Sequence, residues 1–175
     1  RLAFADRDRY AADPDFVKVP AKALLSNAYL KQRADLLKQG SQALPQVSAG
    51  EVAGVKTASA AAIELPSTSH IVVVDAAGNV LSMTTSIENA FGSTLMANGY
   101  LLNNELTDFS FEPQKNGVAV ANRVEGGKRP RSSMAPTIVL KDGKPYLAVG
   151  SPGGSRIIGY VAKTLVAHID WGMDI

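Results

Sequence analysis

Cysteine is absent from the 175 residues of this chain. That absence excludes a disulfide framework, a zinc site built on thiolates and a cysteine nucleophile. The sequence also lacks an apolar run long enough to span a bilayer, so we expect no membrane-spanning segment. It has two histidines, and neither has a partner at a metal-ligand spacing, so we expect no metal site.

Charge is scarce and nearly balanced. Charged residues make up 19% of the chain, hydrophobic residues make up 46%, and the formal net charge is +2. This composition is typical of a globular domain with a core rather than of a disordered chain. The basic residues are scattered apart from "GGKRPRSS", so nucleic acid is not expected as the main partner. The sequence begins without methionine or a signal peptide and reads as part of a helical region, so we expect a fragment of a longer polypeptide.

The first third of the sequence predicts helices and then a linker. Residues 1–10 read as the end of a helix, and "ADPDF" predicts a turn. A second helix is expected to begin at Pro20 and to end at Gly40. Residues 39–66 are rich in alanine, serine and glycine and have no clear period, which predicts a long exposed linker.

From Ser69 onwards the pattern changes to strands. "HIVVVD" and "NVLSMTTS" flank the turn signal "AAG" and predict a hairpin, whose first strand is apolar on both faces as in a buried sheet. "PTIVLKDGKPYLAVG" predicts a second hairpin that turns at Asp142-Gly143. "SPGGSRIIGYVAKTLVAHIDWG" predicts a glycine loop and a helix with Ser155 as its N-cap and Gly172 at its end. Hairpins with flanking helices indicate a layered α+β domain.

The loop "SPGGS" places Gly153 and Gly154 before a predicted helix. Backbone N–H groups at such a position can converge on an anion, and glycine allows close approach, so an oxyanion hole is one interpretation. A tight strand-to-helix turn is the simpler interpretation when the spacing is taken alone.

The motif "KRPRSSM" combines positive charge with adjacent hydroxyl groups. Arg129 and Arg131 together with Ser132 and Ser133 could hold a carboxylate. The alternative is a solvated basic loop in front of the strand "PTIVL", which the motif alone favours.

Three acidic residues form another candidate group. Glu88 follows a strand end, and Glu105 and Asp108 are three apart, so these two share a face if their segment is helical. Clustered carboxylates favour a cationic ligand such as an ammonium group. Acidic residues are more often part of a solvated surface.

Thr68 lies where the predicted linker meets the first predicted strand. A threonine hydroxyl is a weak nucleophile without a base, and an N-terminal threonine can use its own α-amine for that purpose. Cleavage just before Thr68 would create this arrangement, and the end of a linker suits such a cut. The alternative is that Thr68 only begins a strand. His70, on the same face of that strand, could serve a serine–histidine–aspartate triad, although no nucleophile-elbow pattern supports this.

Taken together and in order, the motifs resemble the γ-glutamyltranspeptidase family. The resemblance rests on "TSHIVVVDAAGNVLSMTTSIENAFGS", "GYLLNNELTDFS", "GKRPRSSMAPTIVL" and "GSPGGSRII", with "DPDFVKVP" upstream, and it covers essentially the whole chain. It implies an N-terminal nucleophile hydrolase with an αββα sandwich, of which this chain would hold part. Residues 1–67 would be the C-terminal part of the large subunit, ending in a mobile linker at about 39–67. Residues 68–175 would begin the small catalytic subunit.

The resemblance also implies a role for each candidate residue. The precursor would cut itself between Ser67 and Thr68, and Thr68 would then act as the nucleophile, with its freed amine as the general base. Ser86 would supply a second hydroxyl that hydrogen-bonds the nucleophile. Gly153 and Gly154 would bind the oxyanion. Ser132 and Ser133 would bind the α-carboxylate, and the α-ammonium group would be bound by Glu88, Glu105 and Asp108. Glutamates stand at two positions where some members carry Asn and Gln, and a carboxylate can still accept from an ammonium.

The implied activity is γ-glutamyl transfer and hydrolysis, acting on glutathione and other γ-glutamyl compounds without a cofactor. Amino acids, peptides or water would be the acceptors, the rest of both subunits would be the protein partners, and the location would be periplasmic or secreted. One alternative is an acylase of the same family acting on glutaryl or cephalosporin side chains. Another is a non-enzymatic domain or an inactive fragment.

Overall fold

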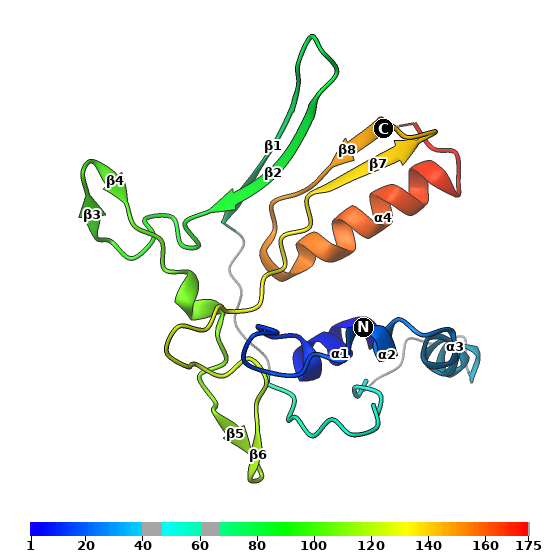
Figure 1. Ribbon diagram of the computed structural model, residues 1–175, viewed down its shortest axis with the longest axis vertical. Helices are drawn as coiled ribbons and strands as arrows, with labels where there is room; N and C mark the ends of the chain where they lie inside the picture. Colours follow the sequence, from blue (N-terminus) through cyan, green and yellow to red (C-terminus); the bar gives the residue numbers. More distant parts are fainter. Residues whose placement is uncertain (40–46, 61–66, 175) are drawn as a thin grey trace. The chain divides into compact units, whose positions relative to one another are not determined.

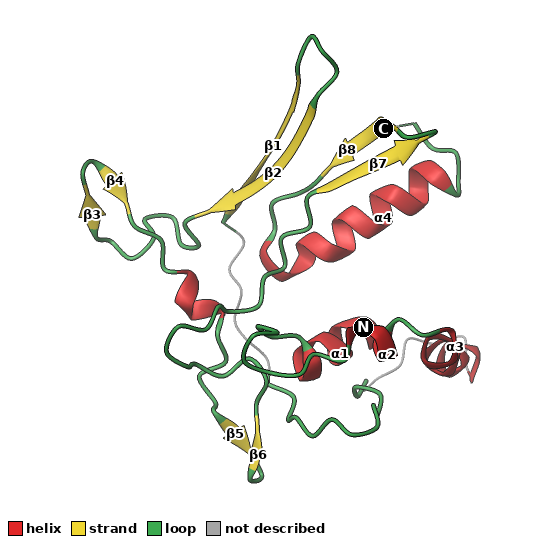
Figure 2. Cartoon of the chain, in the orientation of Figure 1, coloured by secondary structure: helices red, strands yellow, loops and turns green. Residues whose placement is uncertain are grey.

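A computed structural model describes residues 1–39, 47–60 and 67–174 of the chain (Figure 1). Helices and strands are mixed along the chain, as Figure 2 shows. The chain forms two compact units, each made of two separate segments. The first unit contains Arg1–Ile63 and Leu106–Arg131, and the second contains Glu64–Glu105 and Ser132–Ile175.

The first unit is mainly helical. Its elements are α1 (Leu2–Tyr10), α2 (Ala21–Leu24), α3 (Asn27–Asp35), the 3-10 helix η1 (Leu36–Gln39) and the short hairpin of β5 (Gln114–Lys115) and β6 (Val118–Ala119). Tyr10, Tyr29 and Val52 form a buried core, and the Tyr10 hydroxyl donates a 2.7 Å hydrogen bond to the Gly50 carbonyl. Burial raises the pKa of Tyr29 to about 12.

Two predictions for this unit need correction. The single helix predicted from Pro20 is interrupted at Ser26, which has extended backbone angles and caps α3 by accepting a hydrogen bond from the Tyr29 N–H. The predicted end of that helix at Gly40 lies outside the described residues. The segment at 47–60 is not uniformly exposed as predicted, because Val52 and Ala60 are buried there.

The second unit contains two long hairpins. β1 (Thr68–Val74) pairs antiparallel with β2 (Val80–Ser86), and β7 (Thr137–Lys141) pairs antiparallel with β8 (Lys144–Val149). Both predicted hairpins are therefore confirmed. Asp142 and Gly143 have φ values of +53° and +76°, as expected for a two-residue hairpin turn. A shorter hairpin joins β3 (Met96–Ala97) and β4 (Tyr100–Leu101).

The glycine loop leads into the 3-10 helix η3 (Gly154–Arg156) and then into α4 (Ile157–Ile169). The predicted N-cap was wrong, because Ser155 lies inside η3 and Arg156 precedes α4 without a side-chain cap. The helix ends at Ile169, three residues before the predicted Gly172. α4 packs on the second hairpin, where the Tyr146 hydroxyl lies 2.9 Å from His168 Nε2 and the two rings stack.

The prediction of a strand buried on both faces was wrong for this chain. The outer half of β1, from Ile71 to Val74, is 43–62% exposed, and β1 belongs to a two-stranded sheet with β2. Among the residues described, no helix combines the length and the apolar character that crossing a membrane requires. The segment from Glu105 to Asp108 forms the 3-10 helix η2 (Glu105–Asp108), so the condition under which its two acidic ends share a helical turn is met.

Candidate active site

Thr68 and Ser86 are brought face to face by the first long hairpin. Thr68 is the first residue of β1, and the antiparallel register places it directly opposite Ser86, the last residue of β2. Both residues are half-buried. Residues opposite each other in such a pair have Cβ atoms about 5 Å apart, so the two hydroxyl groups share one small region.

Ser86 is hydrogen-bonded to the peptide bond that precedes Thr68. Its hydroxyl donates a 2.7 Å hydrogen bond to the carbonyl oxygen of Ser67 and accepts a 2.8 Å bond from the backbone N–H of Glu88. Because the Glu88 N–H occupies one lone pair of the hydroxyl oxygen, the hydroxyl proton is directed at the Ser67 carbonyl. A donor in this position polarises the bond between Ser67 and Thr68.

A cavity of about 380 Å³ opens at this junction. It is lined almost entirely by residues that carry hydroxyl groups: Ser67, Thr68, Ser69, Thr85 and Ser86, together with Ile87. The cavity gives a ligand or a water molecule access to the Thr68 region of the second unit.

His70 is engaged within its hairpin. Its Nδ1 lies 2.9 Å from Thr84 Oγ1 and its Nε2 lies 3.4 Å from Ser82 Oγ, both across the strand pair on β2. Ser82 also donates to the carbonyl of Val149, at the end of β8. Both ring nitrogens of His70 therefore have partners on β2.

The acidic group is held by backbone contacts after β2. Glu88 is 5% exposed and has a φ of +70°, an unusual conformation for a residue other than glycine. Asn104 accepts a 2.9 Å hydrogen bond from the Asn89 N–H, and its own N–H donates to the Ile87 carbonyl. These two bonds fasten the start of η2 to the loop that carries Glu88.

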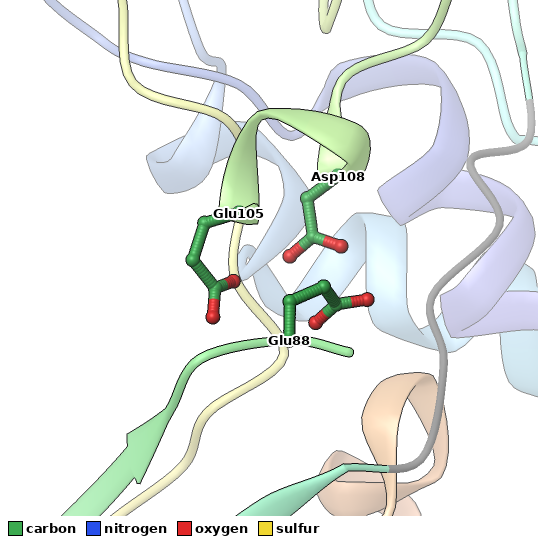
Figure 3. A group of neighbouring side chains, drawn as sticks. All are labelled: Glu88, Glu105 and Asp108. Carbon is green, nitrogen blue, oxygen red and sulfur yellow. The ribbon is translucent and has the colours of Figure 1, made fainter. Parts of the chain in front are cut away.

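The carboxylates of this group are close together. Glu88 and Glu105 have carboxylate oxygens within 4.8 Å of each other, and Asp108 ends the helical turn that Glu105 begins (Figure 3). The Glu105 N–H is capped by the Asn103 side chain at 3.0 Å, which begins η2. Carboxylate oxygens in this arrangement can hold an organic ammonium group or a hard metal ion.

The two arginines of "KRPRSSM" already pair with carboxylates of the chain. Arg129 donates from Nε and Nη2 to Asp13 at 3.0 and 2.8 Å and also contacts Asp15, while Arg131 pairs with Asp8 at 3.0 Å. The prediction that these arginines help to hold a ligand carboxylate is therefore not favoured. Their positive charges are paired with carboxylates within the first unit.

The two serines of the same motif differ in burial. Ser132 is exposed, and its Oγ accepts a 3.1 Å hydrogen bond from the Met134 N–H, whereas Ser133 is 6% exposed. Gly153 and Gly154 have φ values of +135° and +55°, and a Cβ added to Gly153 would lie 2.9 Å from the Tyr160 ring. Local backbone geometry therefore requires glycine in this loop, whether or not it binds an anion.

Asn122 was missed by sequence reasoning. It is completely buried in the first unit, where its Nδ2 donates to the Asp108 carbonyl at 2.7 Å and its Oδ1 accepts from the Arg131 N–H at 3.0 Å. Asn122 thereby fixes the backbone of one predicted ammonium-binding residue and of the residue before the serine pair. No local pattern in the sequence distinguishes it from a surface asparagine.

The predicted site residues thus fall into separate places. Thr68 and Ser86 meet at the hairpin junction, and Glu88 and Glu105 meet at the start of η2, where Asp108 shares the helical turn. Ser132 and Ser133 lie before β7, and Gly153 and Gly154 lie before α4.

Comparison with known proteins identifies relatives along the whole chain. The family model described as Gamma-glutamyltranspeptidase matches residues 1–175. A glutathione hydrolase proenzyme from Bacillus subtilis (strain 168) is 45% identical over 184 residues, which cover 99% of this chain and 30% of that protein. An acylase ACY 1 proenzyme from Pseudomonas sp. (strain SE83) is 35% identical over 177 residues, which cover 100% of this chain and 29% of that protein.

The fold has a counterpart among solved structures. A mutant of the γ-glutamyltranspeptidase from Helicobacter pylori is 47% identical with a TM-score of 0.53, and the match covers 61% of each chain. This likeness confirms the predicted α+β fold of the N-terminal nucleophile hydrolase type, which is present here in part. The chain spans about 30% of the length of the curated relatives that it matches.

Proposed function

The chain belongs to the γ-glutamyltranspeptidase family, and we propose that the protein containing it hydrolyses and transfers γ-glutamyl groups. Glutathione and other γ-glutamyl compounds are the donors, and water, amino acids or peptides are the acceptors. Residues 1–67 contribute the end of the large subunit, and residues 68–175 contribute the start of the small subunit. The protein works in the periplasm or outside the cell, which fractionation of the producing cells tests.

The observation that carries this proposal is the 2.7 Å hydrogen bond from the Ser86 hydroxyl to the Ser67 carbonyl. In the precursor, the Thr68 Oγ attacks the carbonyl carbon of Ser67, and negative charge develops on the oxygen that Ser86 contacts. The bond from this carbon to the Thr68 nitrogen then breaks, and the hydroxyl proton passes to that nitrogen. Water hydrolyses the resulting ester, which frees both the Thr68 hydroxyl and its α-amine.

The mature nucleophile then acts on the substrate. The free α-amine of Thr68 takes the hydroxyl proton as Oγ attacks the γ-carbonyl carbon, and it returns this proton to the leaving amine. Backbone N–H groups at Gly153 and Gly154 stabilise the oxyanion. The γ-glutamyl ester on Thr68 is finally resolved by water, which gives glutamate, or by an acceptor amine, which gives a new γ-glutamyl amide.

The two ends of the glutamyl group are bound by opposite chemistry. Glu88, Glu105 and Asp108 accept hydrogen bonds from the α-ammonium, and the proximity of the first two carboxylates supports this role. Ser132 and Ser133 bind the α-carboxylate. Because such carboxylates could also hold a metal ion, we expect activity to persist after EDTA treatment, and a loss restored by a divalent cation would contradict the ammonium assignment.

An acylase that acts on glutaryl groups is the second candidate, since an acylase proenzyme is among the relatives. A glutaryl group has no α-ammonium, so it leaves the acidic group without a cationic ligand. Comparing rates on γ-glutamyl and glutaryl anilides distinguishes the two activities. Preference for the glutaryl anilide would favour the acylase.

The decisive test uses the full-length protein. Its intact mass should show two chains, with the second beginning at Thr68, and Thr68→Ala should leave one uncut chain. A wild-type protein that stays uncut would count against both the nucleophile and the proposed cleavage.

A further inference from the structure

The first unit joins segments from both sides of the proposed cleavage site. One segment, Arg1–Ile63, precedes Thr68, and the other, Leu106–Arg131, follows it. After cleavage between Ser67 and Thr68, no peptide bond connects these segments. Whatever holds them together must then be non-covalent.

Asp13 makes one of the contacts between the two segments. Its side chain is 1% exposed, and its carboxylate accepts three hydrogen bonds from Arg129: one from the backbone N–H at 3.0 Å, one from Nε at 3.0 Å and one from Nη2 at 2.8 Å. The Asp15 N–H donates a fourth at 3.1 Å. The Arg129 guanidinium holds the pKa of the Asp13 carboxyl well below its usual range.

The turn around Asp13 is built to present this carboxylate. The N–H groups of Phe16 and Val17 both donate to the Asp13 carbonyl at 3.1 Å, and Pro14 restricts the backbone at the same place. These bonds restrict the backbone of the turn, and the Asp15 N–H contacts the carboxylate itself.

The two members of this ion pair differ in exposure, because Arg129 is exposed and Asp13 is buried. The Arg129 side chain is 68% exposed, and exposed ion pairs contribute little to stability. The Asp13 carboxylate is buried, however, and without the guanidinium it would remain charged with two of its four hydrogen bonds missing. The cost of breaking this pair lies mainly in that carboxylate.

Further contacts between the two segments surround this pair. Arg131, whose side chain is 3% exposed, pairs with Asp8 at 3.0 Å. The Ala58 N–H donates a 2.9 Å hydrogen bond to the Ala119 carbonyl, where the two segments form a short parallel bridge. Together these contacts make a polar interface inside the first unit.

We propose that the buried Asp13 carboxylate and the Arg129 guanidinium form a clamp that keeps the two chains associated after cleavage, an inference that rests on the proposed self-cleavage at Thr68. The partner of each segment is the other product of the same precursor. The clamp also holds the backbone at Arg129, three residues before Ser132 in the sequence.

The test uses the cleaved full-length protein with an affinity tag on its first chain. Arg129→Met and Asp13→Asn remove the ion pair, and retention of the second chain is measured on immobilised protein during washes with increasing urea. We expect both variants to release the second chain at least about tenfold faster than the wild type. Retention equal to that of the wild type in either variant, with normal cleavage, would overturn the clamp.

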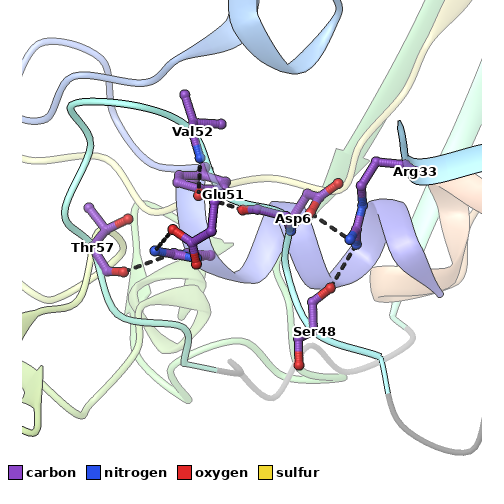
Figure 4. A network of polar contacts seen from close by, with 9 residues as sticks. Asp6, Arg33, Ser48, Glu51, Val52 and Thr57 are labelled. Carbon is purple, nitrogen blue, oxygen red and sulfur yellow. Dashed lines mark hydrogen bonds and ion pairs between the residues drawn. The ribbon is translucent and has the colours of Figure 1, made fainter. Parts of the chain in front are cut away.

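The matched control is Glu51→Gln. Glu51, which is labelled in Figure 4, pairs with Arg9 through two hydrogen bonds. Both residues precede Thr68, so this pair does not connect the two products. It should release the second chain at the wild-type rate. A release as fast as that of Arg129→Met would indicate general loosening of the unit and overturn the clamp.

A second arm separates this inference from the proposed function. A recognition site for a sequence-specific protease is inserted before Ser67 in the Thr68→Ala protein, so that both chains form without self-cleavage. If the wild type does not cut itself but Arg129→Met still releases its second chain faster in this background, only the proposed function fails. If Arg129→Met does not fold, Arg129→Lys keeps the charge without the paired hydrogen bonds, and its release should be faster than the wild type.

Discussion

Replacing Gly150 with alanine tests whether His70 links the Thr68 strand to the loop before the two glycines. Gly150 follows β8, and a Cβ added there would lie 2.0 to 2.4 Å from three atoms of the His70 ring. Ordinary contacts begin near 3.4 Å, so the ring or its strand has to move by about 1 Å or more. Gly150 is therefore a packing requirement of His70.

The expected cost has two parts. Moving the ring disrupts the 2.9 Å hydrogen bond to Thr84, which contributes about 1 kcal/mol. Overpacking at such a site costs about 1–3 kcal/mol more. The sum, about 2–4 kcal/mol, should appear as a lower urea midpoint of the full-length protein. A displacement of about 1 Å near a nucleophile can also slow turnover about a hundredfold, which γ-glutamyl anilide hydrolysis measures.

Two further variants make this experiment specific. Gly159→Ala in α4 adds the same methyl group where nothing lies within 4 Å, and it should be neutral or stabilising by up to about 1 kcal/mol. The double variant His70→Ala, Gly150→Ala has room for the methyl group and should be more stable than the sum of the single variants predicts. Unchanged stability in Gly150→Ala, or additive effects in the double variant, would refute the reasoning.

Three other outcomes are expected. Ser86→Ala should slow self-cleavage by about 10²–10³, because one donor to the developing oxyanion is lost, whereas Ser86→Thr should retain most of the rate; time courses of chain cleavage decide this. Asn122→Ala should lower the free energy of unfolding by about 2–4 kcal/mol, because two buried backbone groups lose their partners, and an unchanged urea midpoint would contradict that role. The lowered pKa of Asp13 means that its contribution to stability is complete above its ordinary pKa of 3.8 and declines as the pH falls below that value. The difference in urea midpoint between wild type and Arg129→Met should therefore hold above about pH 4 and shrink as the pH falls below 3.8, and a difference that stays constant down to about pH 3 would argue against the ion pair as its source.

Local sequence patterns predicted the strands well. The hairpin turns at "AAG" and Asp142-Gly143 were correct because turn chemistry and alternating side chains act over a few residues. The segment from Glu105 to Asp108, for which the spacing left a helical turn open, does form one. Each of these features is decided by residues that are close in the sequence.

Features that depend on distant residues were predicted poorly. The break at Ser26 was missed because a capping serine inside an apolar pattern competes with helix continuation, and the pattern alone does not decide the outcome. The partners of Arg129 were missed because Asp13 lies 116 residues away in the sequence. Burial of Val52 likewise depends on Tyr10 and Tyr29.

The candidate site was likewise predictable only in part from the sequence. The family resemblance supplied the positions of Thr68 and Ser86, and the strand register then placed them opposite each other. The hydrogen bond from Ser86 to the Ser67 carbonyl required the structure, because it depends on the path of the backbone just before the strand. No sequence pattern pointed to Asn122, because its importance lies entirely in its burial and its two backbone partners.

Glu88 has a left-handed backbone conformation, so the benefit of a carboxylate at this position is opposed by a conformational cost. Asparagine adopts a φ near +70° more readily than glutamate does. Glutamate at this position therefore has a conformational cost of about 1 kcal/mol or more, and it places a carboxylate close to that of Glu105. A chain with asparagine at this position would gain backbone stability, whereas a chain with glutamate gains attraction for a cation.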